Sequence, residues 1–172
     1  ILYGQIVDTN TQWISEKLDI YGFKVRRKIS VGDQASEIED VVKESSQKAK
    51  IVILTGGLGP TKDDITKSTL ARIFDDTLVI EPHAEALIRD YFISRGRPFT
   101  ELNRQQAAIP SKCTYLPNLT GTAPGMWFDV DGKVIISVPG VPYEMKNIIA
   151  LNNGLTTVMK TRLKTNQEDK QQ

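Results

Sequence analysis

Cysteine is nearly absent from this sequence of 172 residues, in which Cys113 is the only one, so the sequence supports no intramolecular disulfide. Small secreted domains held by disulfides carry about four or more cysteines, so that class is excluded and a reducing, cytoplasmic location is expected. No apolar run approaches the ~20 residues that a membrane helix needs, and residues Ile1 to Gln5 have no signal-peptide pattern. We therefore expect no membrane as a partner.

The sequence also lacks an excess of charge of either sign. Lys and Arg number 22 and Asp and Glu number 21, which gives a net charge of +1 and no overall field that would attract nucleic acid. One local basic cluster, Lys24, Arg26, Arg27 and Lys28, is best explained as the exposed face of a strand, without interleaved aromatic residues that could stack on bases. We expect no nucleic-acid partner, and any anionic ligand must be bound by a local site.

The length and composition fit one packed domain. Hydrophobic residues make up 40% of the sequence and charged residues 25%, as in soluble globular proteins. The last residues are polar and contain a single leucine. We expect one domain over residues 1–159 and a disordered tail over residues 160–172.

Apolar periodicity predicts helices that alternate with strands. The continuous apolar run 51–54 is typical of a strand buried on both faces of a parallel sheet, and Asp131-Gly132 between two apolar runs predicts a hairpin. The expected helices cover 9–21, 34–48, 65–74, 82–95, 103–108 and a segment from Tyr143 onward, and the expected strands cover 23–30, 51–54, 126–130 and 133–138. The predicted fold is α/β, a three-layer α/β/α sandwich with a mostly parallel sheet and one antiparallel hairpin, and its ligand site lies at the carboxyl ends of the strands.

The segment after strand 51–54 holds three glycines and leads into a predicted helix. Glycines let backbone N–H groups approach an anion, and a helix N-terminus adds partial positive charge. The identities of Thr61, Lys62 and Asp63 fit neither a Walker loop nor a dinucleotide fingerprint, and a tight turn alone would explain only one or two glycines. We predict an anion site whose contacts come from Thr55, Gly56, Gly57, Leu58, Gly59 and Thr61.

Two carboxylates, Asp63 and Asp64, follow this glycine loop. A carboxylate repels phosphate unless a cation lies between them, and Mg²⁺-type ions prefer one or two carboxylates together with phosphate oxygens. Alternatively, one of the two acids caps the next helix. The oxygen-rich ligand set favours Mg²⁺, Mn²⁺ or Co²⁺ over a closed zinc site, because the sequence has one histidine and one cysteine.

Five segments together, residues 4–10, 31–33, 55–64, 121–125 and 139–145, resemble the N-terminal domain of the competence/damage-inducible protein CinA, in the molybdopterin-binding (MoCF, MogA-like) superfamily. The resemblance implies an α/β/α fold whose glycine loop and Pro-Gly turn line a pocket for a pterin phosphate or a nucleotide. It also implies metal-dependent hydrolysis of ADP-ribose to AMP and ribose 5-phosphate, and, by analogy, a homo-oligomer. Such domains usually begin with a strand and a Gly-Asp-Glu segment ahead of the stretch that starts here at Ile1, and longer relatives often carry a deamidase domain.

Carried over by position, the resemblance implies that Asp64, Asp8 and Asp33 are catalytic and that Asp8 and Asp64 hold the metal. Asp8 and Asp33 also stand where helix N-caps belong, and Glu144 stands in a first helical turn where the helix dipole alone favours an acid. His83 and Cys113 receive no role. The further ligand-binding residues that the resemblance implies are Asn10, Gly121, Thr122, Gly125, Pro139, Gly140 and Glu144.

Three functions are compatible with these residues. The leading hypothesis is a metal-dependent hydrolase of a nucleotide pyrophosphate, selected by the resemblance. The alternatives are a molybdopterin-binding or adenylylating module of molybdenum-cofactor biosynthesis and a non-catalytic, nucleotide-binding remnant. Residue types alone do not separate them.

Overall fold

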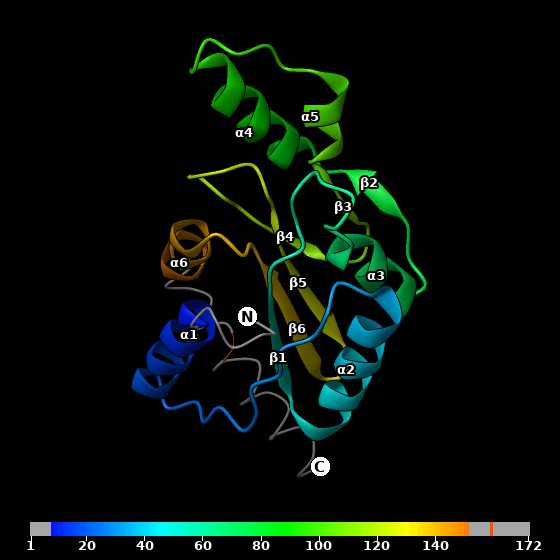
Figure 1. Ribbon diagram of the computed structural model, residues 1–172, viewed down its shortest axis with the longest axis vertical. Coiled ribbons are helices and arrows are strands. Elements are labelled where there is room, and N and C mark those ends of the chain that lie inside the picture. The colour runs from blue at the N-terminus through cyan, green and yellow to red at the C-terminus, as the bar shows by residue number, and fades with distance from the viewer. Residues whose placement is uncertain (1–7, 152–158, 160–172) are drawn as a thin grey trace, which may run out of the picture.

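The computed structural model describes residues 8–151 and residue 159, so the expected tail over 160–172 lies outside the described residues. Helices and strands follow one another along the chain (Figure 1). The helices are α1 (Thr9–Ile20), α2 (Ala35–Lys48), α3 (Thr66–Ile73), α4 (Pro82–Ile93), α5 (Glu101–Gln105) and α6 (Pro142–Leu151). The strands are β1 (Ile51–Thr55), β2 (Leu78–Ile80), β3 (Ala108–Pro110), β4 (Thr114–Leu116), β5 (Gly125–Val130) and β6 (Lys133–Val138).

The main sheet has the strand order β1-β6-β5-β4, and β2 pairs with β3 in a separate antiparallel ribbon. Strand β1 runs parallel to β6, whereas β5 is antiparallel to β6 and β4 is antiparallel to β5. The sheet is therefore mixed, and the expectation of a mostly parallel sheet holds only for the pairing of β1 with β6. Short connections join β4, β5 and β6, and a short connection permits only antiparallel pairing, since a parallel pair needs a long crossover.

Three layers are evident in Figure 1, with α1 and α6 on one face of the sheet and α2 and α3 on the other. The alternation of side chains along β6 explains how one strand serves both layers. Ile136 belongs to a core cluster with Ile14 of α1 and Met145 of α6, whereas the neighbouring Ile135 packs with Val42 of α2 and Leu70 of α3. The predicted α/β/α sandwich is confirmed.

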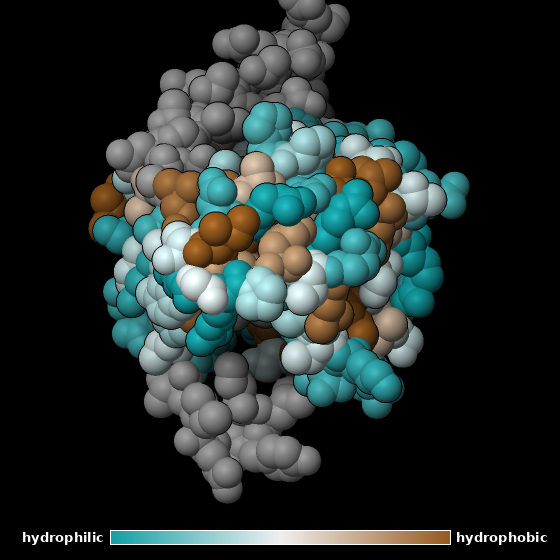
Figure 2. Space-filling model, turned by 90° about the horizontal axis from the view of Figure 1, so that it is seen from above, coloured by the Kyte–Doolittle hydropathy of each residue, from teal (hydrophilic) through white to brown (hydrophobic). Residues whose placement is uncertain are grey.

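Helices α4 and α5 stand beyond one end of the main sheet, at the top of Figure 1, and are attached to it through β2 and β3. A third, smaller core of Ala84, Ile88 and Ala107 holds this part together. Seen from above, this end carries hydrophobic residues scattered among hydrophilic ones (Figure 2). No helix in the described part of the chain is both long enough and apolar enough to span a membrane.

The expected helices and the hairpin are confirmed to within a few residues, and the hairpin turns at Asp131 and Gly132, both with positive φ. The strand expected at 23–30 is wrong, because these residues pair with no strand in the described part of the chain. Its alternating apolar residues do not form a buried face: Val25 is 40% exposed and Ile29 is 43% exposed. Alternation of this kind predicts a strand only where one face is covered.

Candidate functional site

Two loops meet where β1 and β6 end side by side. Because the two strands are parallel, the glycine loop that follows β1 and the Pro139-Gly140 turn that follows β6 emerge at the same edge of the sheet. The backbone N–H of Gly56 donates to the carbonyl of Val138 at 3.0 Å. A Cβ atom on Gly140 would lie 3.2 Å from the Cα of Gly56, so the two turns pack backbone against backbone.

Asn10, in the first turn of α1, joins a third segment to this junction. Its side-chain Nδ2 donates to the carbonyl oxygen of Gly140 at 2.7 Å and to Thr55 Oγ1 at 3.1 Å. Thr55 Oγ1 in turn donates to the carbonyl of Pro139 at 3.2 Å. The structure thus brings together Asn10, Thr55, Gly56, Pro139 and Gly140, which the sequence analysis took from three separate motifs. The Oδ1 atom of Asn10 is buried without a hydrogen-bond partner.

The first two glycines of the loop have different surroundings. Gly56 has φ +106°, and a Cβ atom there would meet nothing within 4 Å, so space is open beside it. Gly57 has φ +70°, and its Cβ would lie 2.1 Å from Thr66 Oγ1, while its carbonyl accepts from the N–H of Thr66 at 3.1 Å. Leu58 is 1% exposed in the core, so only its backbone can face a ligand. Gly57 is therefore required by packing against α3 as well as by backbone conformation.

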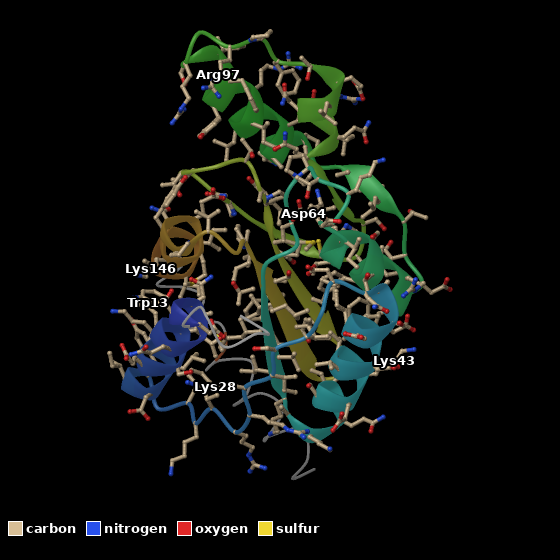
Figure 3. All side chains as sticks on the ribbon, in the orientation of Figure 1. Trp13, Lys28, Lys43, Asp64, Arg97 and Lys146 are labelled. Atoms are coloured by element: carbon tan, nitrogen blue, oxygen red, sulfur yellow. The ribbon has the colours of Figure 1, made fainter. Side chains whose placement is uncertain are left out.

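Asp64 braces the far end of the loop, beside α3 in Figure 3. Its Oδ2 accepts from the backbone N–H of Thr61 at 3.0 Å and from the hydroxyl of Thr61. Partial burial opposes ionisation of Asp64, but the hydrogen bonds from Thr61 outweigh it and lower the pKa of this carboxyl group. The N-cap of α3 is Ile65, without a side-chain capping bond, so the alternative that Asp63 or Asp64 caps this helix is wrong.

The other two predicted acids stand at or just before the N-caps of α1 and α2. Asp8 caps α1 by accepting from the N–H of Thr11 at 2.9 Å, which confirms the capping alternative for this residue. Asp33 is exposed and does not cap α2, whose N-cap is Gln34. The described residues contain no group of three or more His, Cys, Asp or Glu side chains placed to hold a metal ion. A metal held by Asp8 and Asp64, and a catalytic role for Asp33, stay predictions.

Glu144 proves to be more than an acid favoured by the helix dipole. It is buried, and its Oε2 accepts at 2.7 Å from Nδ2 of Asn118, which also donates to the carbonyl of Ala123 at 2.9 Å. A Cβ atom on Gly121 would lie 2.3 Å from the Glu144 carboxylate carbon. The structure therefore places Glu144 against the 118–123 loop that contains Gly121 and the half-buried Thr122. Gly125 begins β5, where its Cβ would lie 3.0 Å from Leu116.

A depression of about 200 Å³ opens beside the second half of the glycine loop. Sequence reasoning missed one residue in its wall, Lys67, which is buried and donates from Nζ to the carbonyl oxygen of Gln106 at 3.1 Å. Burial lowers the pKa of Lys67 to about 8, although the Asp64 carboxylate opposes this shift. The available signal was its position, three residues after Asp64 and in the first turn of α3. The depression is lined by Gly59, Pro60, Thr61, Asp64, Lys67, Ser68, Leu78, Leu102, Gln105, Gln106 and Ala108.

Comparisons with known proteins agree with this arrangement. Residues 1–153 match the family described as "Probable molybdopterin binding domain". A CinA-like protein from Cytophaga hutchinsonii is 58% identical over 150 residues, which cover 87% of this chain and 36% of that protein. A CinA-like protein from Flavobacterium psychrophilum is 49% identical over 153 residues, with the same two shares. The chain thus spans about a third of the length of these curated relatives.

Solved structures show the same fold. The crystal structure of the protein CinA from Thermoplasma acidophilum superposes with a TM-score of 0.80 at 34% identity, and the match covers 91% of each chain. The tungsten cofactor synthesizing protein MoaB from Pyrococcus furiosus superposes with a TM-score of 0.57 at 20% identity, over 93% of this chain and 88% of that one. The second likeness concerns the fold alone.

Proposed function

Because the chain belongs to the family of molybdopterin-binding domains and is related to the CinA-like proteins, we propose that its glycine loop binds a phosphorylated nucleotide and that the domain hydrolyses ADP-ribose to AMP and ribose 5-phosphate. The observation that carries the binding part of this proposal is the junction of Asn10, Thr55 and Gly140 at the carboxyl ends of β1 and β6. Open α/β sheets bind their ligands at such ends. The open space beside Gly56 supports close approach of a phosphate to the backbone.

The donor set fits a cation that is shared with the ligand rather than a resident metal in a closed site. The described residues hold no cluster of three or more ligating side chains, so phosphate oxygens and water would have to complete the coordination. Asp64, with Asp8, would supply the carboxylate oxygens of the protein. A divalent cation, when bound, supplies an activated water for attack on phosphorus.

The residues of the chain itself have defined tasks in this proposal. The N–H of Gly56 already donates to the carbonyl of Val138. The backbone N–H groups that follow it, those of Gly57 and Leu58, would therefore hold the phosphate and withdraw charge from its oxygens. Thr61 fixes the orientation of Asp64 through two hydrogen bonds, which also keep this carboxylate ionised. The buried pair of Glu144 and Asn118 fixes the 118–123 loop beside the start of α6. In this proposal Gly121 and Thr122 of that loop would contact the ligand.

The test is product release from ADP-ribose. The protein, incubated with ADP-ribose and Mg²⁺, Mn²⁺ or Co²⁺ in turn, is expected to release AMP, and chelation is expected to stop the reaction without unfolding the domain. We expect the metal-free domain to be stable because its core clusters consist of packed hydrophobic side chains. Absence of AMP with each of the three metals would refute the hydrolase part of the proposal.

A second candidate function, binding of molybdopterin, is favoured by the description of the family that matches residues 1–153. The same loop would then hold the phosphate of the pterin. Titration of one preparation with molybdopterin and with ADP-ribose separates the two candidates, since only the hydrolase consumes its ligand. Binding of pterin without release of AMP would leave this second function in place of the first.

A further inference from the structure

Lys67 has an environment that is unusual for a lysine. Its side chain belongs to the first turn of α3, is 8% exposed, and borders the depression beside the glycine loop. Removing an ammonium group from water costs free energy unless other groups replace its hydration. An apolar side chain could pack α3 against its neighbours without this cost of dehydration.

The hydrogen bonds in the described part of the chain use only part of the donor capacity of this ammonium group. An ammonium group has three N–H donors. In the part of the chain that the structure describes, Nζ of Lys67 donates to the carbonyl oxygen of Gln106, 39 positions away. The Oδ2 atom of the nearby Asp64 carboxylate accepts its hydrogen bonds from Thr61. The remaining N–H donors of Lys67 therefore have capacity for an acceptor that enters the depression.

The charges around the loop also support binding of an anion by Lys67. The second half of the loop carries the carboxylates of Asp63 and Asp64, which would repel a phosphoryl group. Lys67 brings an opposite charge to the wall of the same depression. The ammonium group is itself largely buried, and an electrostatic attraction for an anion is stronger where water is excluded.

We propose that Lys67 and the depression beside it form an anion subsite, in which the ammonium group binds a phosphoryl group of the ligand directly. This inference rests on the proposed function, because it extends the phosphate site at the glycine loop to a second position. A ligand with two linked phosphoryl groups would place one group at the loop backbone and the other at Lys67. The subsite thus favours a pyrophosphate-containing ligand over one that carries a single phosphate.

The test is calorimetric titration of the protein with inorganic pyrophosphate in the presence of a chelator, so that binding is measured apart from hydrolysis. Lys67→Met keeps most of the length of the side chain and removes its charge, and we expect the Kd for pyrophosphate to rise at least ~10-fold. Lys62→Met is the matched control, because Lys62 is an exposed lysine of the same loop. The Kd of the Lys62→Met protein for pyrophosphate is expected to stay within about twofold of the wild-type value. A folded Lys67→Met protein that binds pyrophosphate as wild type does would overturn the proposal.

A second measurement keeps the proposal testable if Lys67→Met fails to fold. In wild-type protein with isotope-labelled lysine, the Lys67 side-chain NMR signal is expected to shift on addition of pyrophosphate and to saturate with the calorimetric Kd. A signal that does not move at saturation would refute the subsite. Hydrolysis of ADP-ribose is measured separately. A wild-type protein that binds pyrophosphate through Lys67 but releases no AMP would refute only the proposed hydrolase activity. AMP release by Lys67→Met with an unchanged KM would refute only the subsite.

Discussion

Asn10 and Gly140 are 130 positions apart in the chain, yet the side-chain amide of Asn10 donates to the carbonyl oxygen of Gly140 at 2.7 Å. The same amide nitrogen donates to Thr55 Oγ1. One side chain therefore ties the start of α1 to the ends of β1 and β6, beside the glycine loop. Its removal should affect both stability and ligand binding.

Asn10→Ala is expected to lower the free energy of unfolding by about 1–2 kcal/mol, because it removes the hydrogen bonds to Thr55 Oγ1 and to the Gly140 carbonyl. Urea denaturation measures this change, and titration with AMP measures the loss of affinity. The control is Gln12→Ala, since the side chain of Gln12 is exposed and donates to Glu16 within the same helix. An effect of Asn10→Ala no larger than that of Gln12→Ala would contradict the bridging role.

Gly57→Ala should be more destabilising than Gly56→Ala, although both glycines have positive φ. A Cβ at residue 57 meets Thr66 Oγ1 at 2.1 Å, whereas a Cβ at residue 56 meets open space. We expect Gly56→Ala to cost about 1 kcal/mol from backbone strain and Gly57→Ala at least ~2 kcal/mol. Thr66→Ala should recover part of the second loss in a double-mutant cycle. Equal costs for the two glycine variants would rule out the packing explanation.

The sequence was sufficient for the layers of the fold because periodicity reports which faces are buried. The continuous run 51–54 and the Asp131-Gly132 turn correspond to β1 and to the β5–β6 hairpin. Periodicity does not report the partner of a strand, which is why the segment 23–30 was misassigned and the number of parallel pairings was overestimated. Both errors concern contacts between distant parts of the chain.

At the site, too, residue types could be read from the sequence but contacts between distant residues could not. The glycine loop and the Pro139-Gly140 turn could be singled out from their residue types, but not the hydrogen bonds through Asn10 that bring them together. Lys67 was missed because lysines in a first helical turn are ordinarily solvated, and only the tertiary packing of α3 against the turn that follows α5 buries it.

Asp64→Asn is expected to reduce AMP release at least ~100-fold, a loss of ~2.7 kcal/mol in the transition state, because it removes the charge that a cation needs. The asparagine keeps an oxygen that can accept from Thr61, so the melting temperature should change little. Asp63→Asn is the control, since Asp63 is an exposed neighbour. Comparable activity in Asp64→Asn and Asp63→Asn would reduce Asp64 to a loop brace.

The buried ammonium of Lys67 predicts a pH dependence of stability. Its pKa is about 8 in the folded protein, against an ordinary 10.5, so between these values the unfolded chain binds a proton that the folded chain does not. The free energy of unfolding should therefore rise with pH over this window, by a few kcal/mol at most. Cys113 acts in the opposite direction above about pH 9, because burial raises the pKa of its thiol to about 12.

The two effects are separated by comparing wild type with Lys67→Met in denaturant unfolding from about pH 7 to about pH 10. Cys113 is present in both proteins, so its contribution cancels in the difference. Wild type should gain stability relative to Lys67→Met as the pH rises through 8. A difference that does not change with pH would show that the folded protein keeps Lys67 protonated.

The central claim is that the loop between β1 and α3 is the phosphate site, and a crystal structure of the protein with bound AMP tests it most directly. We expect the phosphate within about 3 Å of backbone nitrogens between Gly56 and Gly59. Asn10 should still bridge Thr55 and Gly140 at the edge of the bound ligand. A phosphate bound elsewhere, for example against the basic cluster at residues 24–28, with the glycine loop empty at saturating AMP, would contradict the account.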